Sequence, residues 1–172
     1  MYLETKEIGP EGLVIDRRIT LTLSPAREGE DPVRISEVHL SGEVMRSSGG
    51  ISFMGDLATV ATRSCGRCLE AYELPLDLHF DLLYTTAPET FDKGNDRMDE
   101  DSITVTHYDG ARIDLGELAA EQIYLGLSLK PLCQIDCRGL CPRCGANLNL
   151  GVCGCREEGP KGPRLLVLKT IR

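Results

Sequence analysis

The feature that most constrains this chain is a cysteine-rich stretch near its C-terminal end. Residues 133–155 read CQIDCRGLCPRCGANLNLGVCGC and hold six of the eight cysteines of the protein. Folded proteins hold thiols at this density together either by disulfide bonds or by a metal ion. The stretch is too poor in apolar side chains to fold by itself, so we expect its sulfurs to organise it.

Within this stretch, the spacing of the cysteines is typical of a zinc knuckle. Cys141 and Cys144 are separated by two residues, so that one turn can direct both sulfurs at one ion. Gly145 follows directly and permits the positive φ that points backbone N–H groups at the sulfurs. Cys153 and Cys155 can supply the other two ligands of a tetrahedron.

Length and composition indicate one domain of ordinary size with an appendage. The chain has 172 residues, of which 41% are hydrophobic. We expect a β-rich body over residues 1–130 and a cysteine-rich, basic zinc-knuckle tail over residues 131–172, packed on the body. No apolar run reaches the ~18 residues that span a bilayer, and no secretory signal pattern opens the sequence. We therefore expect a cytoplasmic protein without a membrane partner, with reduced cysteines that favour metal over disulfides.

The charge is unevenly distributed along the chain. Residues 130–172 contain eight Lys or Arg against three Asp or Glu, a charge of +5, whereas the whole chain carries −8. The first 129 residues therefore carry −13. A basic tail on an acidic body hints at contact with nucleic acid, although the pI near 4.9 argues against a general nucleic-acid coat.

Alternating apolar and β-branched residues predict strands in the body. Leu74–Leu82 shows the clearest alternation and indicates a strand with one wet face. Pro75 within it indicates a sheet edge or a strand start. Residues 103–113, with Asp109-Gly110 at their centre, predict a tight hairpin. The other strands are expected at residues 14–23, 33–45 and 51–62.

A helix is predicted between these strands and the cysteine-rich stretch. Apolar residues at helical spacing extend from Leu115 to Leu129, after the capping residue Asp114 and before Pro131. The acidic residues 86–102 are expected to form a surface loop. The fold class is therefore α+β: a mostly antiparallel, curved or barrel-like sheet, one covering helix and a zinc-knuckle tail.

Eight cysteines divide into two sites of four thiolates. We assign Cys141, Cys144, Cys153 and Cys155 to one site, and Cys65, Cys68, Cys133 and Cys137 to the other. A site that combines Cys133 or Cys137 with the tail knuckle is an alternative, so one or two Zn²⁺ ions are expected. All-thiolate tetrahedra leave no open position and are structural.

Cys65-Gly-Arg-Cys68 has two other interpretations. It could be two unconnected thiols in a turn, or a thioredoxin-like redox pair. The redox pair would place its first cysteine at a helix N-terminus, where strand-like sequence stands here. A lowered pKa at Cys65 would favour the redox interpretation.

Little else in the sequence suggests catalysis. The three histidines are isolated and are expected on solvent-exposed faces, and no GxSxG, P-loop or HExxH motif occurs. We expect no enzyme and no small-molecule substrate. Basic side chains of the tail either meet RNA phosphates or only keep the tail soluble: Arg138, Arg143, Arg156, Lys161 and Arg164.

From Cys65 onward, ordered motifs resemble those of the bacterial YceD family, the large ribosomal RNA subunit accumulation proteins. They are Cys65-x-Arg-Cys68-Leu69, Asp114-Leu-Gly-Glu117, Lys130-Pro-Leu-Cys133, Cys137-Arg-Gly-Leu-Cys141-Pro, Cys144-Gly145, Asn147-Leu-Asn149, Cys153-Gly-Cys155 and Pro163-Arg-Leu-Leu. GLCPRCGANLN is the most specific segment. The resemblance implies a role in 23S rRNA accumulation or processing during large-subunit assembly, and it brings no catalytic residue.

The expected function is therefore that of a non-catalytic ribosome-biogenesis factor. Its partners would be 23S rRNA or a pre-50S particle, together with ribosomal proteins or another assembly factor. Two alternatives remain: an enzyme, either a thiol oxidoreductase or an RNA-processing nuclease, and a protein-interaction module that never touches RNA.

Overall fold

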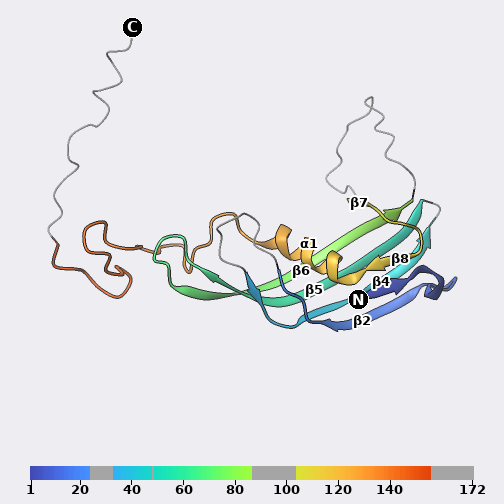
Figure 1. Ribbon diagram of the computed structural model, residues 1–172, viewed down its shortest axis with the longest axis horizontal. Coiled ribbons are helices and arrows are strands. Elements are labelled where there is room, and N and C mark those ends of the chain that lie inside the picture. The colour runs from blue at the N-terminus through green and yellow to red at the C-terminus, as the bar shows by residue number, and fades with distance from the viewer. Residues whose placement is uncertain (24–32, 48, 87–103, 156–172) are drawn as a thin grey trace, which may run out of the picture.

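The computed structural model describes residues 1–23, 33–47, 49–86 and 104–155 (Figure 1). Strands dominate these residues, and one α-helix follows them. In chain order the elements are β1 (Tyr2–Glu4), the 3-10 helix η1 (Thr5–Glu7), β2 (Leu13–Ile19), β3 (Arg34–Ile35), β4 (Val38–Ser47), β5 (Gly50–Ser64), β6 (Ala71–Thr85), β7 (Thr104–His107), β8 (Arg112–Asp114) and α1 (Leu115–Gly126).

The body is built on one six-stranded sheet. Its order is β2-β4-β5-β6-β7, with the short β3 also paired to β5. All pairs in it are antiparallel except β6–β7, which is parallel. Among the described residues, the outer strands β2 and β7 do not pair with each other, and the sheet is open and curved (Figure 1). The α+β class with a mostly antiparallel sheet is confirmed, whereas a barrel-like form goes beyond this arrangement.

The long β5–β6 hairpin forms the middle of the sheet. Each strand has 15 residues, and the two pair from Ile51↔Tyr84 to Ser64↔Ala71. Side chains on one face are buried, and the rings of Phe53 and Phe80 pack edge-to-face with centroids 5.2 Å apart. The alternation predicted for Leu74–Leu82 is thus confirmed. The strand is longer than predicted because its pairing with β5 continues beyond the alternating segment.

Pro75 lies where the sequence places it, at a sheet edge. It is opposite Val60 on β5, and on its other side β7 pairs only with residues 82–85 of β6. In the described part of the sheet, a proline at this position therefore removes no ladder hydrogen bond.

The helix α1 covers the sheet at β6 and buries its apolar stripe (Figure 1). The predicted cap is confirmed, because the Asp114 carboxylate accepts hydrogen bonds from the N–H groups of Gly116 (2.8 Å) and Glu117 (3.3 Å). The helix ends at Gly126, earlier than predicted, because Leu127 is already extended with ψ 126°. Gly126 also packs closely on β6, where a Cβ would lie 2.6 Å from the Leu78 side chain.

The predicted hairpin over residues 103–113 is wrong. The two strands there join different sheets: β7 runs parallel to β6, and β8 pairs with β1. The Asp109 carboxylate does form a turn, since it accepts hydrogen bonds from the N–H groups of Ala111 and Arg112. The strands separate after this turn because Ile113 enters the core, whereas Val105 is 54% exposed and offers nothing for a hairpin to bury.

Two other predicted segments differ in extent. The strand expected over residues 33–45 is divided into β3 and β4, because the Ser36 N–H donates to Val60 O and its hydroxyl accepts from Val60 N–H. The strand expected over residues 14–23 is β2, which ends at Ile19. Apart from Thr86, the loop expected over residues 86–102 lies outside the described residues, as does the end of the tail from residue 156 onward. No helix among the residues described is long and apolar enough to cross a membrane.

Candidate metal centres

The eight cysteines form two groups of four. The body cluster consists of Cys65, Cys68, Cys133 and Cys137, and the tail cluster of Cys141, Cys144, Cys153 and Cys155. Within each group, all sulfurs lie within 4.8 Å of one another, and all eight thiols are free. These are the two groups assigned from the sequence; whether metal occupies them stays a prediction.

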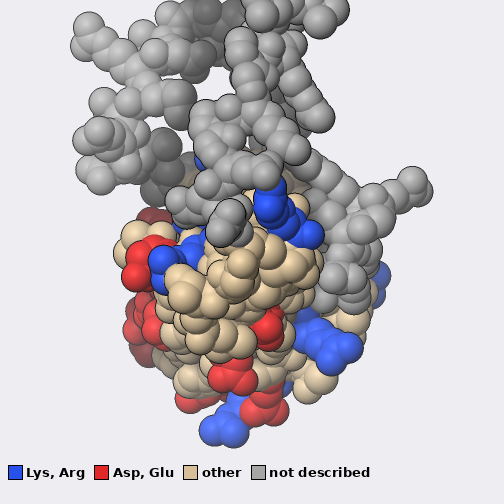
Figure 2. Space-filling view, turned by 90° about the vertical axis from the view of Figure 1, so that its left-hand side faces the viewer, with Lys and Arg blue, Asp and Glu red and all other residues tan. Residues whose placement is uncertain are grey.

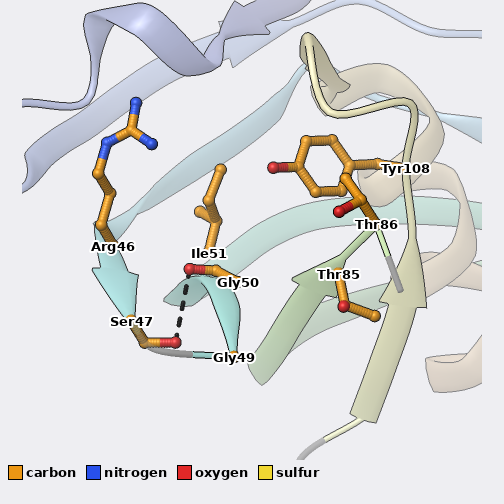
Figure 3. Close-up of a pocket in the computed structure, with 8 residues that line it drawn as sticks. All are labelled: Arg46, Ser47, Gly49, Gly50, Ile51, Thr85, Thr86 and Tyr108. Atoms are coloured by element: carbon orange, nitrogen blue, oxygen red, sulfur yellow. Dashed lines mark hydrogen bonds between the residues drawn. The ribbon is translucent and has the colours of Figure 1, made fainter.

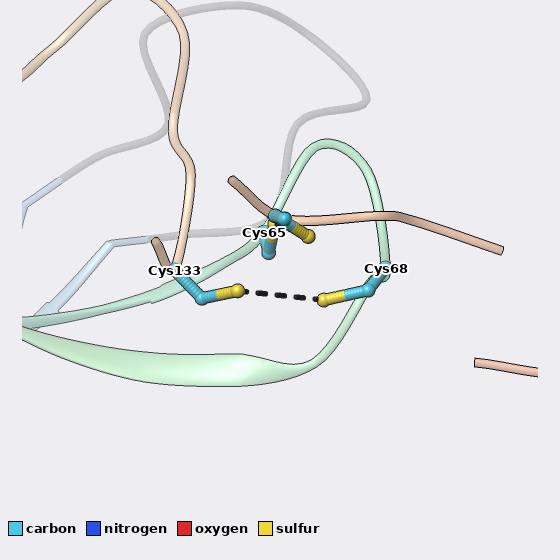
Figure 4. Close-up of side chains that lie close together, drawn as sticks. Cys65, Cys68 and Cys133 are labelled. Carbon is cyan, nitrogen blue, oxygen red and sulfur yellow. Dashed lines mark hydrogen bonds between the residues drawn. The ribbon is translucent and has the colours of Figure 1, made fainter. Parts of the chain in front are cut away.

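The body cluster joins the sheet to the segment that follows the helix. Cys65 and Cys68 lie in the turn between β5 and β6, at one end of the elongated molecule (Figure 1). Cys133 and Cys137 come from the chain after α1, and the Cys133 and Cys68 side chains point toward each other (Figure 4). The Pro131 carbonyl accepts a hydrogen bond from the Gly66 N–H (2.8 Å), which fixes the approach of this segment.

The sulfur separations suit a tetrahedral ion. The Sγ atoms of Cys65 and Cys137 are 3.7 Å apart, as are those of Cys68 and Cys133. A tetrahedron of thiolates about 2.3 Å from Zn²⁺ has edges of about 3.8 Å, whereas a disulfide needs about 2.05 Å. The donor set therefore fits Zn²⁺, and four protein ligands would leave no position for water or substrate.

The two Cys-x2-Cys turns share one backbone geometry. In the body cluster, Leu69 N–H donates to Cys65 O (2.9 Å), and Cys65 N–H donates to Glu70 O (2.9 Å). In the tail cluster, the N–H of Gly145 donates to Cys141 O (2.9 Å), and that of Cys141 donates to Ala146 O (2.8 Å). Sequence reasoning treated both as knuckles, and the hydrogen bonds now show that they are the same turn.

The residue after each turn has a positive φ. Gly145 has φ +73°, as expected for a glycine in this position. Leu69 occupies the equivalent position with φ +63°, and its side chain is 66% exposed. Sequence reasoning missed this strained leucine, although its place after Cys68 matches that of Gly145 after Cys144.

The first cysteine of each knuckle has a lowered pKa. Burial raises the pKa of Cys65, but the backbone N–H groups of Cys68 and Arg67 that point at the sulfur bring it down to about 6. In the tail cluster, backbone N–H groups in the equivalent positions lower the pKa of Cys141 to about 6. Each knuckle thus favours a thiolate at its first cysteine.

Two other thiols in each cluster have raised pKa values, and Cys133 and Cys155 are raised furthest. Burial and the neighbouring sulfurs raise the pKa of Cys133 to about 12. The adjacent Cys144 thiol, followed by burial, raises the pKa of Cys155 to about 12. Four sulfurs this close cannot ionise together unless a cation lies among them, and a divalent ion would remove that repulsion.

Two residues that sequence reasoning missed support the body cluster. The Arg67 guanidinium donates to Cys137 O (2.9 Å), and the Asn149 side chain donates to Cys137 Sγ (3.3 Å). The Asn149 hydrogen bond is the largest of the causes that lower the pKa of Cys137. The sequence signal for Asn149 was its place in the Asn147-Leu-Asn149 motif.

The expected RNA-binding residues are only partly described. Arg138 and Arg143 are both exposed near the clusters, whereas Arg156, Lys161 and Arg164 lie outside the described residues. Figure 2 shows the cysteine end of the molecule, where basic and acidic groups surround an area of other residues. In the part of this face that is described, the basic groups are interspersed with acidic ones and do not form one continuous patch.

The histidines lie away from both clusters, as predicted. His39 and His79 are exposed on the body and contact Asp16 and Asp56, respectively, each at 2.9 Å. His107, on β7, is also exposed. Among the described residues, neither group suited to a metal contains a histidine.

A cavity of about 460 Å³ lies at the β4–β5 turn (Figure 3). Its lining contains no cysteine, and its arginine is already engaged. Arg46 donates to the carbonyls of Thr5 (2.6 Å) and Ile8 (3.2 Å), which ties the η1 segment to β4. The cavity is lined by Arg46, Ser47, Gly49, Gly50, Ile51, Thr85, Thr86 and Tyr108, and it is separate from the metal centres.

Comparison with known proteins places the chain in one family. The family model described as "Large ribosomal RNA subunit accumulation protein YceD" matches residues 53–172, a range that contains both clusters and α1. The chain is 30% identical over 150 residues to the chloroplastic YCED homolog 1 of Arabidopsis thaliana, covering 73% of this chain and 46% of that protein.

Two further relatives match the chain over the same share of its length. The chloroplastic YCED homolog 1 of Zea mays is 30% identical over 148 residues, covering 73% of this chain and 50% of the relative. An uncharacterised protein of Mycobacterium bovis is 29% identical over 128 residues, with coverage of 73% and 59%, respectively. This chain therefore spans about half the length of the curated relatives it matches, and no solved structure matches it. By its family match and its curated relatives, the chain belongs to the YceD family of large ribosomal RNA subunit accumulation proteins.

Proposed function

We propose that this protein is a non-catalytic factor that promotes accumulation of 23S rRNA during assembly of the large ribosomal subunit. Two Zn²⁺ ions, one in each cluster, would order its cysteine end for contact with rRNA or with ribosomal proteins. The convergence of eight free thiols into two four-sulfur groups carries this proposal. Membership of a family of large ribosomal RNA subunit accumulation proteins supports the setting in ribosome assembly.

The metal would act as a structural element. Because four thiolates would fill the tetrahedron, the ion would have no open position for water or substrate, and its role would be to hold the four cysteines together. In the body cluster, they tie the segment after α1 to the tip of the β5–β6 hairpin. The tail of residues 131–172 would then dock on the body of residues 1–130 as a shaped unit in the cytoplasm.

RNA contact would come from the basic side chains of the tail. We assign this role to Arg138, Arg143, Arg156, Lys161 and Arg164, because arginine and lysine neutralise phosphates and release counterions. The acidic body, with its charge of −13 over residues 1–129, would instead face basic ribosomal proteins or another assembly factor.

A salt titration tests the RNA contact. Binding of the full-length, zinc-loaded chain to 23S rRNA fragments is measured between about 50 and 200 mM salt. R138A/R143A should weaken binding and reduce the slope of log K against log[salt] by about two phosphate contacts. The matched control R17A/R18A removes the same charge from β2 of the body and should leave the slope unchanged. An unchanged slope in R138A/R143A contradicts the assignment of these two residues, and no retention of the wild-type chain favours a protein-interaction module.

A thiol oxidoreductase is a second candidate, favoured by the Cys65 pKa of about 6. The surroundings of Cys65 argue against it. Strands flank the Cys65–Cys68 turn on both sides, and two further sulfurs lie within 4.8 Å. A low thiol pKa also suits a metal ligand, because only the thiolate coordinates.

Disulfide mapping separates the two roles. A redox enzyme would form a Cys65–Cys68 disulfide in glutathione buffers and would reduce a peptide disulfide, and C65S would lose this activity. A structural centre would keep four thiolates on the ion and protect them from alkylation. Zinc-loaded protein that shows the disulfide and the activity would contradict the structural role.

A further inference from the structure

The two clusters are connected by a side chain that belongs to neither. Asn149 lies between Cys144 and Cys153, within the loop of the tail cluster. Its side-chain nitrogen nevertheless donates to Sγ of Cys137, a ligand of the body cluster, at 3.3 Å. Its side-chain oxygen accepts a hydrogen bond from the backbone N–H of Arg138 at 2.7 Å. The side-chain amide of Asn149 therefore makes hydrogen bonds both to the Cys137 sulfur and to the backbone N–H of the next residue.

Backbone pairing sets the position of Asn149. The Leu148 N–H donates to Gly139 O (2.9 Å), and Leu140 and Asn147 form an antiparallel bridge. The Asn147 side chain then accepts the Asn149 N–H (3.0 Å). The loop of the tail cluster thus lies along the three-residue connection, residues 138–140, that leads from one cluster to the other.

Apart from these hydrogen bonds and one from the Asn147 side chain to the Glu70 carboxylate (3.4 Å), the described part of this loop is held by the cysteines at its ends. Leu150 and Val152 are each 86% exposed, so little apolar burial holds this part of the chain. Closing the loop costs conformational entropy, which the bonds of Cys144 and Cys153 to a shared ion would offset. Order at the tail cluster therefore determines whether Asn149 is in place.

We propose that the two clusters bind metal cooperatively and that Asn149 is the positioning residue that couples them. The inference rests on the two metal centres of the proposed function. An ion in the tail cluster fixes the loop, the loop presents Asn149, and Asn149 orients the Cys137 sulfur toward the body cluster. Groups outside the coordination sphere that orient a ligand typically change metal affinity by 10–100-fold. Thermodynamic linkage requires the same factor in the opposite direction.

Native mass spectrometry tests the coupling directly. The full-length reduced chain is titrated with Zn²⁺ below two equivalents, and chains that hold zero, one or two ions are counted. Coupled clusters give mainly empty and doubly loaded chains. Asn149→Ala should make the singly loaded chain accumulate, with the body cluster about 10–100-fold weaker. Cysteine alkylation then shows which four thiols the ion protects.

Two further variants complete the test. Leu150→Ala changes an exposed neighbour in the same loop and should reproduce the wild-type distribution. C153S/C155S removes the tail cluster and should weaken the body cluster as much as Asn149→Ala does. Adding Asn149→Ala to C153S/C155S should cause little further loss, because both changes remove the same interaction.

The outcomes separate this inference from the function on which it rests. A statistical share of singly loaded wild-type chains, or a body cluster unaffected by both variants, overturns the coupling and leaves two independent metal centres. A chain that binds no Zn²⁺ overturns the metal centres and the coupling together. Asn149→Ala is the decisive variant where C153S/C155S fails to fold, since it keeps all eight thiols.

Discussion

Each of the two clusters has four cysteine sulfurs as donor atoms, but the clusters occupy different places in the fold. The body cluster joins Cys65 to Cys137, 72 positions away, and three of its four thiols are buried. The tail cluster lies within residues 141–155, and its Cys144 is exposed. One group of sulfurs fastens two distant segments, whereas the other shapes a local loop. The fold around a site, more than its ligands, thus decides what that site stabilises.

The largest expected difference between the clusters comes from removing their ligands. C65S/C68S should release the tail from the hairpin tip, because the body cluster spans the body and the segment after α1. C141S/C144S should leave the sheet and α1 folded and, while Zn²⁺ saturates the weakened body cluster, should loosen only residues 141–155. Limited trypsin digestion of the zinc-loaded chain measures this, with rapid cleavage after Arg67, in the turn at the hairpin tip, expected only for C65S/C68S. Equal cleavage of both variants at Arg67 would remove the distinction.

Acidification should release metal from both clusters, because protons compete for thiolates. In the metal-free chain, Cys65 and Cys141 have pKa values lowered from 9.0 to about 6. Their contribution to stability is fully present above pH 9 and is lost as the pH falls through about 6.

The thiols with raised pKa values change stability with pH in the opposite direction. For Cys133 and Cys155, whose pKa values are raised to about 12, the contribution is present below pH 9 and is lost between pH 9 and about 12. Urea unfolding of metal-free, reduced protein should therefore show stability that rises from pH 6 to 9. C65S and C141S should each flatten this rise, and a profile that neither variant changes would contradict the thiol assignments.

A substitution in the connection between the clusters, at Gly139, should destabilise the fold more than the same substitution in the tail knuckle, at Gly145. Gly139 has φ +72°, and a Cβ there would lie 3.1 Å from Arg67 O on the hairpin tip. Gly139→Ala should cost about 1–3 kcal/mol, from backbone strain and this contact. Gly145→Ala is the matched control: its φ is +73°, but a Cβ there meets nothing within 4 Å. Chemical unfolding of the two zinc-loaded variants should rank Gly139→Ala as the more destabilised, and the reverse order would argue against docking at Arg67.

The smallest expected effect concerns the residue that follows each turn, which is Leu69 in the body cluster and Gly145 in the tail cluster. Leu69→Gly should stabilise the chain by about 0.5–1 kcal/mol, because it relieves a left-handed leucine whose side chain is mostly exposed. Gly145→Leu should destabilise it by a similar amount. Thermal unfolding of both variants measures the pair, and destabilisation by Leu69→Gly would mean that the leucine side chain stabilises the fold despite its exposure.

The sequence predicted the positions of strands, turns and caps better than it predicted which strands pair with each other. The alternation of Leu74–Leu82 and the Asp114 cap depend on neighbouring residues, and both were correct. The parallel contact of β7 with β6 depends on residues 22 positions apart, which local turn chemistry does not reveal. Asp109-Gly110 accordingly predicted a turn correctly and a hairpin wrongly.

The same limit applies to the candidate site. Cysteine spacing favoured the grouping of sulfurs that the structure has, but it left open a site that combined Cys133 or Cys137 with the tail knuckle. It could not predict Asn149 as a partner of Cys137, or Arg67 as a partner of its carbonyl. Those contacts arise only when the tail loop folds back over the connection between the clusters.

The central claim is that each four-thiol cluster holds one zinc ion. Elemental analysis of the full-length chain, purified under reducing conditions without added chelator, tests it most directly. We predict two zinc ions per chain in the wild type, one in C153S/C155S and protection of four thiols by each ion. A chain with eight reduced, freely alkylated thiols and no bound metal would contradict the account.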